Sequence, residues 1–405
     1  MYENSHKWKM EKIPQPIQIL KQFSDRNQNY VDVIKRSSDL VKSFLYSRGY
    51  ISIDTPILER TDLFIRKASG DISSQLYTFE DPEGVSVSLR PDFTASVIRS
   101  LGNKGLLNDK DALKVSYSGP VFRFFNDDSS LRQFNQVGSE LFGSKSNNAD
   151  SEVIELASGS IEELGLEGIQ IRIGHIGVLL DLLSHFNLPS RSKLFLINEF
   201  RSVNKSYGLE QILNKAKNQN LLNGNFDFFK ELQISSDKTN DMKKLRQELT
   251  KKLENKVDSP LGSRSIEDIR ERIIEKIISR TSFEDFNEAT ESLLGLMELN
   301  GSLEKIKKYF KERNIKTNQL EKLEEIIEGV SEKHKIVIDL NVTRNLAYYT
   351  GMVFDIFYNN YDKSIIIGGG GRYDELPKNL GYKFNSGALG FAFNIDLVSE
   401  LVEKK

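Results

Sequence analysis

The sequence predicts an α+β protein with an antiparallel sheet flanked by helices and interrupted by a helical insertion. Segments with the period-two alternation of strands fall in two blocks, residues 75–143 and 336–371. Between these blocks, residues 188–332 are rich in Lys and Glu and carry apolar residues at helical spacing. Helical patterns also precede the first block and follow it, which adds the flanking helices.

The composition excludes several classes of protein. Formal net charge is -2, from 56 Lys+Arg and 58 Asp+Glu, so no global attraction to nucleic acid or to an anionic membrane is expected. The chain has no cysteine and only 4 histidines, so no disulfide, cysteine nucleophile or metal site is expected. Residues 1–11 lack the apolar core of a signal peptide, and no run of about 18 apolar residues occurs. A cytoplasmic protein is expected.

The N-terminal elements can be placed from local signals. Residues 1–28 are polar and predict a loosely docked arm. Apolar residues at helical spacing predict a helix over residues 30–48, which Gly49 ends. A short strand over residues 50–53 then leads to Pro56, which cannot donate to a central ladder.

The first strand block begins with a hairpin. Residues 76–79 and 85–89 flank Asp-Pro-Glu-Gly at 81–84, which has the composition of a tight turn. Alternation predicts further strands over residues 113–117 and 132–142. After these strands, the pattern of apolar residues predicts a helix over residues 150–164, a strand over 169–173 and a second helix over 178–183.

Strands return near the C-terminus and set the predicted domain division. Residues 336–340, 352–358 and 365–367 are apolar and β-rich, and residues 388–401 are predicted to form a closing helix. The predicted organisation is an arm (1–28), one domain split between 29–187 and 333–405, and a mainly helical insertion (188–332). The charges of the insertion are expected to form a solvated helical surface.

Four polar clusters lie within the strand blocks, and each has a structural alternative to a functional role. In residues 89–94, Leu-Arg-Pro-Asp-Phe-Thr, the Asp92 side chain could simply cap a helix. Arg123 could be a solvated arginine after the turn at Gly119. Gln136 and Glu140 share a strand face, which could face solvent.

The fourth cluster joins residues 342–351 to a glycine run. Gly368 to Gly371 is not followed by Lys-Ser or Lys-Thr, so it is not a Walker-type phosphate loop. Such glycines could instead permit a turn or a close approach of backbones. If the four clusters converge, carboxylates would lie opposite arginines beside several tyrosines. That arrangement suits a zwitterion, namely an amino acid with a polar, cationic or ring side chain.

Taken together, these segments resemble histidyl-tRNA synthetase and its paralogue, the regulatory subunit of ATP phosphoribosyltransferase, which are class II aminoacyl-tRNA synthetase-like proteins. Residues 50–64 resemble the first class II motif, which in that family builds a dimer interface around a proline, here Pro56. Residues 119–143 resemble the second motif and residues 369–397 the glycine strand and third motif. Residues 344–354 resemble the histidine-specific signature Arg-Gly-Leu-Asp/Ala-Tyr-Tyr-Thr-Gly-x-x-Phe.

The resemblance implies a histidine-binding site at matching positions. Arg123 matches the second-motif arginine, which in synthetases also touches the activated carboxylate. The implied histidine-binding residues are Asp92, Thr94, Arg123, Gln136, Glu140, Arg344, Tyr348, Tyr349 and Tyr373.

The sequence departs from a synthetase where ATP would bind. Phe125 stands where the family has an acid that holds adenine, and Ser130 where a loop normally carries an arginine. Leu397 replaces the arginine of the third motif. Loss of these groups should remove much of the transition-state stabilisation that amino-acid activation needs. Asn345 and Ala347 also depart from the histidine signature. The chain reaches Lys405 shortly after the third motif, so no anticodon-binding domain and no strong tRNA binding are expected.

The resemblance therefore implies a non-catalytic regulatory subunit of short-form ATP phosphoribosyltransferase, with no cofactor, no metal and no catalytic residue. In that family the subunit assembles with a short catalytic subunit, typically as a hetero-octamer, for the first step of histidine biosynthesis, and histidine feeds back on the complex. Two alternatives stay open at this point. One is a minimal histidyl-tRNA synthetase without its anticodon-binding domain, and the other is an amino-acid-sensing scaffold.

Overall fold

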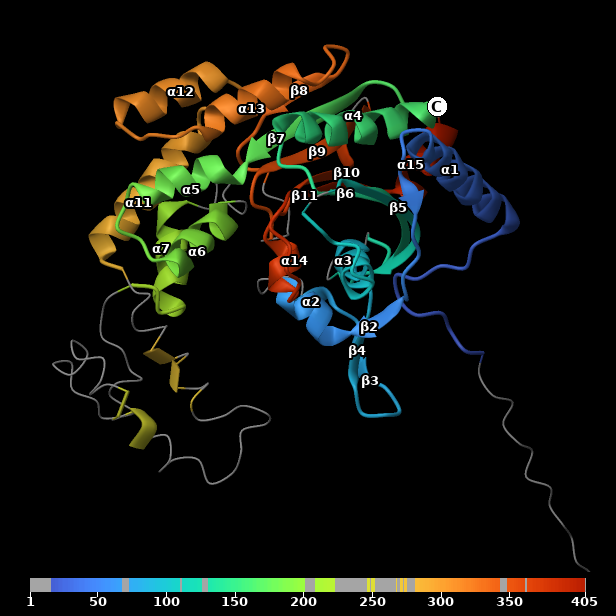
Figure 1. Ribbon diagram of the computed structural model, residues 1–405, viewed down its shortest axis with the longest axis horizontal. Coiled ribbons are helices and arrows are strands. Elements are labelled where there is room, and N and C mark those ends of the chain that lie inside the picture. The colour runs from blue at the N-terminus through green and yellow to red at the C-terminus, as the bar shows by residue number, and fades with distance from the viewer. Residues whose placement is uncertain are drawn as a thin grey trace, which may run out of the picture.

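The computed structural model describes residues 16–67, 73–109, 111–125, 130–200, 208–222, 281–342, 348–360 and 363–404, with scattered residues between 246 and 274. An eight-stranded sheet forms its centre (Figure 1). The strands are, in spatial order, β1 (Ile51–Ser52), β5 (Leu113–Phe122), β6 (Gln133–Phe142), β11 (Ala388–Asn394), β10 (Lys363–Arg372), β9 (Met352–Asn360), β7 (Ile169–His175) and β8 (Lys335–Ile338). The outermost pairs, β1 with β5 and β7 with β8, are parallel, and all other neighbours are antiparallel. The predicted fold class is confirmed.

The predicted hairpin forms a second, smaller sheet. Strands β3 (Thr78–Glu80) and β2 (Leu58–Arg60) both pair antiparallel with β4 (Ser86–Leu89). Asp81 closes the hairpin turn, because its Oδ1 accepts hydrogen bonds from the backbone N–H groups of Glu83 and Val85 at 2.9 and 2.8 Å. This sheet leads the chain through β4 toward the large sheet and the pocket described below.

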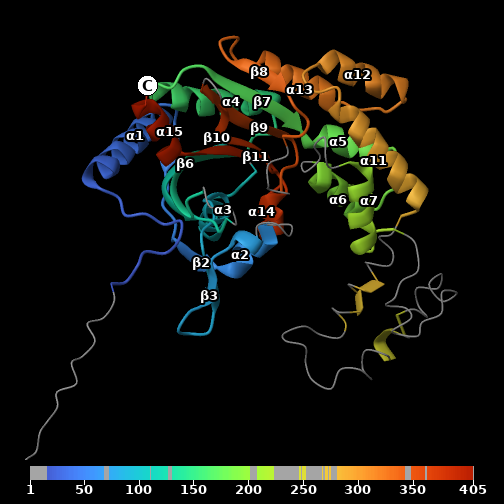
Figure 2. The ribbon, with the colours of Figure 1, turned by 180° about the vertical axis from the view of Figure 1, so that it is seen from behind.

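One face of the large sheet, here called the back face, is covered by helices. These helices are α1 (Gln28–Tyr46), α4 (Asn147–Glu163) and α15 (Ile395–Glu403), which Figure 2 shows from behind. Val137, Leu141 and Phe393 are almost fully buried beneath them. The opposite face, here called the front face, carries α3 (Thr94–Asn103), α2 (Thr61–Lys67), the short helix α14 (Leu376–Asn379) and a 3-10 turn (Ser73–Gln75) on its side of the molecule. Phe93 stacks on Tyr117 of the front face, with ring centroids 4.5 Å apart.

The described parts of residues 188–332 are mainly helical and lie beside the β7–β8 edge (Figure 1). After α5 (Ile176–Ser184) come α6 (Ser190–Phe200), α7 (Leu209–Asn218), α11 (Phe283–Met297), α12 (Leu303–Glu312) and α13 (Gln319–Glu328). Helix α13 is joined to the body, because Ser151 Oγ of α4 donates to the carbonyl of Ile326 at 2.9 Å.

The predicted closing helix over residues 388–401 is wrong in its first half. Residues Ala388–Asn394 form β11, which lies between β6 and β10, and the helix begins only at Ile395. Leu389, Phe391 and Phe393 alternate with smaller residues and are buried on the back face. The segment is rich in Ala, Leu and Phe, but pairing on both sides within the sheet decides its conformation.

The N-terminal residues that the structure describes run along the sheet before α1. The backbone N–H of Arg132 donates to the carbonyl of Gln22 at 2.9 Å. Arg26 pairs with Asp396 at the start of α15 at 3.0 Å. None of the helices in the described part of the chain is long and apolar enough to cross a membrane.

Candidate functional site

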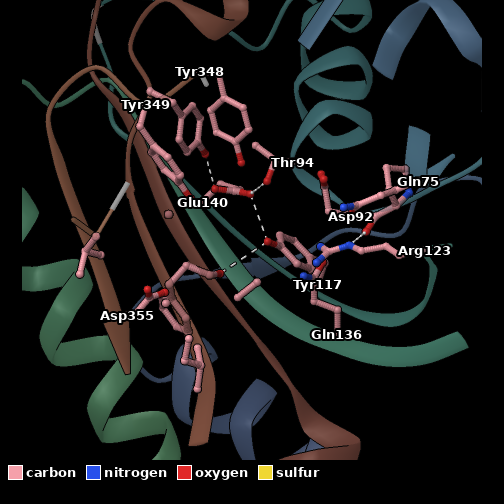
Figure 3. A pocket seen from close by; sticks show the side chains of 18 of the residues that line it. Gln75, Asp92, Thr94, Tyr117, Arg123, Gln136, Glu140, Tyr348, Tyr349 and Asp355 are labelled. Carbon is pink, nitrogen blue, oxygen red and sulfur yellow. Dashed lines mark hydrogen bonds between the residues drawn. The ribbon is translucent and has the colours of Figure 1, made fainter. Parts of the chain in front are cut away.

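A cavity of about 360 Å³ opens on the front face of the sheet (Figure 3). Its lining comes from segments that are distant in sequence, namely residues 75–94, β5 and β6, the segment before β9, and strands β9 to β11. Eight of the nine predicted site residues line it: Asp92, Thr94, Arg123, Gln136, Glu140, Tyr348, Tyr349 and Tyr373. The ninth, Arg344, lies outside the described residues. The four polar clusters therefore converge on one pocket.

Asp92 and Thr94 are brought to the pocket by the connection between β4 and α3. The N-cap position of α3 is Phe93, whose side chain makes no capping hydrogen bond, and Asp92 lies one residue before it with its side chain in the pocket lining. The side chain of Arg90 holds this connection in place through hydrogen bonds. Its Nε donates to the carbonyl of Pro120 at 2.9 Å and its Nη1 to the carbonyl of Thr55 at 2.6 Å. The connection is therefore held to both neighbouring segments.

Glu140 is the polar centre of the pocket and is 1% exposed. Its Oε1 accepts hydrogen bonds from Thr94 Oγ1 at 2.8 Å and from the Tyr117 hydroxyl at 3.1 Å. Its Oε2 accepts a short hydrogen bond from the Tyr373 hydroxyl. Three hydroxyl groups thus hold the carboxylate in place, and the alternative of a solvent-facing strand is wrong for Gln136 and Glu140, because both are buried.

Burial and the nearby carboxylate keep the tyrosines of the pocket protonated. Burial is the main cause that raises the pKa of Tyr373 and Tyr117 well above the ordinary value, and the charge of Glu140 adds to it. The pKa of Tyr348 is raised by burial first and then by Tyr349, Asp92 and Glu140. These hydroxyls therefore remain hydrogen-bond donors over the physiological pH range.

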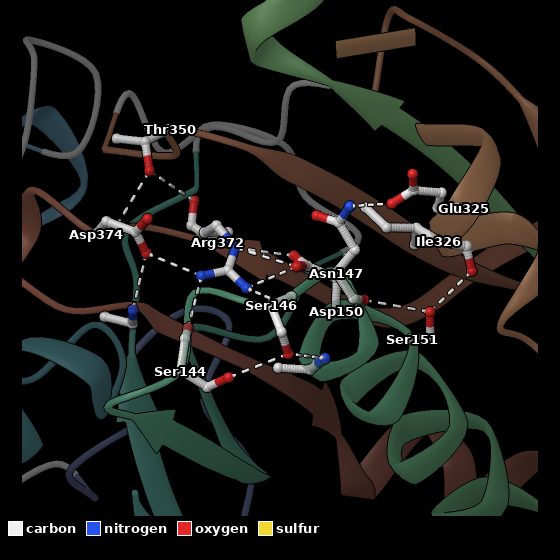
Figure 4. Close-up of polar contacts among 12 residues, drawn as sticks. Ser144, Ser146, Asn147, Asp150, Ser151, Glu325, Ile326, Thr350, Arg372 and Asp374 are labelled. Atoms are coloured by element: carbon white, nitrogen blue, oxygen red, sulfur yellow. Dashed lines mark hydrogen bonds and ion pairs between the residues drawn. The ribbon is translucent and has the colours of Figure 1, made fainter. Parts of the chain in front are cut away.

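A buried ion pair behind the pocket positions Tyr373 (Figure 4). The guanidinium of Arg372 bonds to Asp150 of α4, with Nη2 2.6 Å from Oδ2, and its Nη1 donates to the carbonyl of Ser144 at 2.9 Å. Asp374 continues the network, because its Oδ1 accepts from the backbone N–H of Ala388 at 2.8 Å. The residues on both sides of Tyr373 are thus fixed to α4 and β11, which restricts the ring to the pocket.

Arg123 and Gln136 form a second polar group at the other side of the pocket. Arg123 Nε donates to the carbonyl of Pro91 at 2.8 Å, and its guanidinium carbon lies 5.5 Å from the centre of the Phe134 ring. Arg123 is therefore an ordered pocket residue, and the alternative of a solvated turn residue does not hold. Gln136 is 7% exposed, and its Oε1 has no hydrogen-bond partner among the described residues. A ligand that donates a hydrogen bond would satisfy this oxygen.

The glycine run lies inside strand β10, so the alternative of a turn at a strand end is wrong. A Cβ on Gly370 would lie 2.0 Å from the carbonyl oxygen of Gly390. A Cβ on Gly390 would lie 1.8 Å from Glu140 Oε2. The glycines therefore permit close approach of backbones, as the second alternative had it, and they leave room for Glu140 in the pocket.

Several lining residues were missed from the sequence, among them Gln75, Tyr117 and Asp355. Tyr117 looks like an ordinary core residue in an alternating strand, and only the structure places its hydroxyl on Glu140. Asp355 had a signal, because it is the one charged residue in the otherwise apolar run from Met352 to Tyr358. In Figure 3, Asp355 lies on the side of the pocket opposite Arg123.

The arrangement can bind a small zwitterion. Asp92, Glu140 and the tyrosine hydroxyls can receive an ammonium group or an imidazole ring, and Arg123 can take a carboxylate. Within the described ranges, no three His, Asp or Glu side chains are grouped as metal ligands.

The sequence comparisons with known proteins all match histidyl-tRNA synthetases. A sequence profile of histidyl-tRNA synthetase matches residues 22–261 and 217–398. The histidine–tRNA ligase of Methanocaldococcus jannaschii is 30% identical over 354 residues, which are 86% of this chain and 67% of that protein. The ligase of Fervidobacterium nodosum is 28% identical over 378 residues, covering 92% of this chain and 70% of that protein.

Solved structures show the same fold. A Bacillus halodurans protein described as an ATP phosphoribosyltransferase regulatory subunit/histidyl-tRNA synthetase has a TM-score of 0.63 at 21% identity, covering 96% of this chain and 84% of that chain. A histidine–tRNA ligase subunit from Alicyclobacillus acidocaldarius has a TM-score of 0.59 at 19% identity, covering 97% and 99%. With the profile matching most of its length, the chain belongs to the histidyl-tRNA synthetase family of class II folds.

Proposed function

We propose that this chain is a non-catalytic regulatory subunit of a short-form ATP phosphoribosyltransferase that binds L-histidine in the front-face pocket. The observation that carries the proposal is the charge of the pocket lining. Asp92, Glu140 and Asp355 line the cavity, and Arg123 is the one cationic side chain among the described lining residues. This lining favours an amino acid with a cationic or ring side chain and disfavours a nucleotide triphosphate, whose phosphates require several positive groups.

The residues that replace the ATP-binding groups support this proposal. Phe125, which stands where the family has an adenine-holding acid, lines the pocket with a ring that cannot accept a hydrogen bond from adenine. Leu397, in place of the third-motif arginine, lies in the first turn of α15 and packs against the apolar back-face core. Without these groups, the transition state of adenylation lacks electrostatic stabilisation.

The proposed partners follow from the same role. The chain would assemble with a short catalytic subunit, as a hetero-octamer in the cytoplasm, and would itself pair through the region of Pro56. Ile51, Ile57 and Leu58 of that region are 55%, 42% and 42% exposed, which is unusual for neighbouring apolar side chains. Sedimentation of the Ile57→Asp variant tests this pairing, and an unchanged dimer would exclude this surface.

A second candidate function is histidyl-tRNA synthesis. It is favoured by the curated relatives, which are histidine–tRNA ligases at 27–30% identity over 354 to 392 residues. The two functions differ in one reaction, because only a synthetase forms histidyl-adenylate.

Two assays separate the candidates. In the first, histidine-dependent ATP–pyrophosphate exchange is measured beside a known histidyl-tRNA synthetase, and no exchange above background is expected. Appreciable exchange would instead support the synthetase. In the second, the chain is added to a short catalytic subunit, and phosphoribosyl-ATP formation should rise and then fall when histidine is added.

The Glu140→Gln variant sharpens the second assay. It should still raise phosphoribosyl-ATP formation, because Glu140 is 1% exposed and contributes almost nothing to the molecular surface, but histidine should inhibit the complex much less. No stimulation by the unaltered chain, together with histidine binding, would indicate an amino-acid-sensing scaffold with another partner.

A further inference from the structure

One wall of the pocket is built by a turn that follows strand β8. Asn341 and Val342 of this turn line the cavity, and Leu340 beside them is 1% exposed. The turn is closed by Asp339, whose backbone carbonyl accepts from the N–H of Val342 at 3.0 Å and whose Oδ1 accepts from the N–H of Asn341 at 3.0 Å. The position of this turn therefore determines where the wall of the pocket lies.

Strand β7 supports the turn from one side. The backbone N–H of Asp339 donates to the carbonyl of Ile173 at 2.8 Å. A Cβ on Gly174 would lie 2.8 Å from the carbonyl oxygen of Asp339 and 3.1 Å from that of Val342. The turn thus rests directly on the backbone of β7 and has no space to move toward it.

The helical segment of residues 281–332 supports the turn from the other side. The contact is made by Asn300, which lies between α11 and α12. Asn300 Nδ2 donates to Asp339 Oδ1 at 2.8 Å, and Asn300 Oδ1 accepts from the backbone N–H of Leu340 at 3.1 Å. The next residue, Gly301, donates its N–H to the carbonyl of Ile338 at 2.7 Å. One side-chain amide therefore uses both its donor and its acceptor to hold the turn, in the manner of a clamp.

We propose that Asn300 is a positioning residue for the pocket, through which the α11–α12 helices and occupancy of the pocket are energetically coupled. Displacement of these helices moves Asn341 and Val342, and a ligand that contacts this wall stabilises one position of the helices. The proposal rests on the proposed function only for the identity of the ligand. It gives residues 281–312 a role in the response to that ligand.

The first test uses the ligand-free full chain and hydrogen exchange. In Asn300→Asp, two carboxylates face each other across the former hydrogen bond, so amide exchange at residues 339–342 should rise about tenfold or more, as expected for the loss of a partly buried polar contact. Adding Asp339→Asn removes this repulsion, because the new amide nitrogen can donate to the carboxylate at position 300 while the amide oxygen keeps the hydrogen bond from the backbone N–H of Asn341, so slow exchange should be restored. The matched control is Asn287→Ala on α11, where the side chain bonds only to the exposed Glu291 at 2.9 Å, and no change is expected.

The second test adds L-histidine to the same four proteins and measures affinity by calorimetry and exchange in α12. Affinity should fall about tenfold in Asn300→Asp and recover in the double variant. Bound histidine should slow exchange in α12 of the unaltered chain and of the double variant, but not of Asn300→Asp at saturation.

The outcomes separate the two proposals. Unchanged exchange at 339–342 in Asn300→Asp, or failure of Asp339→Asn to rescue it, would overturn the positioning role whatever the ligand. Equal histidine affinity in all four proteins would overturn it as well and leave the proposed function intact. If the unaltered chain does not bind histidine, the proposed function fails, and the ligand-free exchange still decides the role of Asn300.

Discussion

The two faces of the large sheet are made by the same strands but have opposite chemistry. On the back face, side chains such as Val137, Leu141 and Phe393 pack under α1, α4 and α15. On the front face, the alternate positions of β6 and β11 carry Glu140 and Gly390. Because successive side chains of a strand point to opposite faces, one strand can supply both a dry core and a polar pocket.

The comparison indicates how the fold tolerates a buried carboxylate. The pocket is less well packed than the back face, because Gly390 contributes no side chain. It also contains an unpaired polar atom, because Gln136 Oε1 has no hydrogen-bond partner among the described residues. Burial of such groups costs free energy unless they are paired. The apolar back face of the same strands offsets this cost. The two faces should therefore respond to mutation in different ways, and the largest effect on folding is expected from the back face.

Phe393→Ala should separate stability from binding most clearly. The Phe393 side chain is 1% exposed, so its truncation leaves a cavity and should lower the free energy of unfolding by about 3–5 kcal/mol. Urea denaturation measures the loss, and calorimetry on the folded fraction should find nearly unchanged histidine affinity. Ile366→Ala on the front face is the control, because Ile366 is 52% exposed and should cost less than about 1 kcal/mol. Equal losses from both variants would contradict the division between faces.

Glu140→Gln should have the reverse pattern. The amide oxygen can still accept from Thr94 and Tyr117, so the fold should persist, but the charge that receives a cationic group is lost. Histidine affinity should fall about 10- to 100-fold, as for a hydrogen bond to a charged group worth roughly 1.5–3 kcal/mol. Glu152→Gln is the control, because Glu152 pairs with Lys114 outside the pocket. Unchanged affinity in Glu140→Gln would remove Glu140 from the binding site.

His175, the last residue of strand β7, links the stability of the protein to pH. It caps α5, its Nδ1 accepts from the N–H of Gly177, and burial, followed by Lys322 and Arg372, lowers its pKa to about 3. The unfolded chain therefore binds a proton below pH about 6.5 that the folded chain does not, so stability falls as pH decreases from there toward 3.

His175→Asn keeps a capping side chain and removes this proton. Between pH 6 and 4, denaturation should show a slope of unfolding free energy against pH that is smaller by up to about 1.4 kcal/mol per pH unit. An identical slope in both proteins would mean that His175 is protonated in the folded state.

The smallest effect is expected at the periphery of the helical segment. Lys308 and Glu312 on α12 lie 3.7 Å apart with side chains 75% and 58% exposed. Lys308→Ala should change the free energy of unfolding by less than about 0.5 kcal/mol, because exposed ion pairs are screened by solvent. Urea denaturation measures this change. A loss of unfolding free energy clearly larger than about 0.5 kcal/mol would show that this pair on α12 contributes more to stability than its exposure indicates.

Much of the fold could be predicted because its signals are local. The hairpin around Asp81 and the helix α1 depend on turn chemistry and on helical spacing, and both lie where the sequence predicts them. The pocket residues Asp92, Gln136 and Glu140 could be named because the motifs that contain them are continuous stretches of sequence.

The sequence by itself thus determined the α+β class, the places of most of its strands along the chain and the residue types that a zwitterion site needs. Only the tertiary structure decided that residues 388–394 are a strand and that Tyr117 bonds to Glu140. Each of these depends on a neighbour that is distant in sequence. Sheet pairing and buried hydrogen bonds arise from such long-range contacts, which propensity and periodicity do not encode.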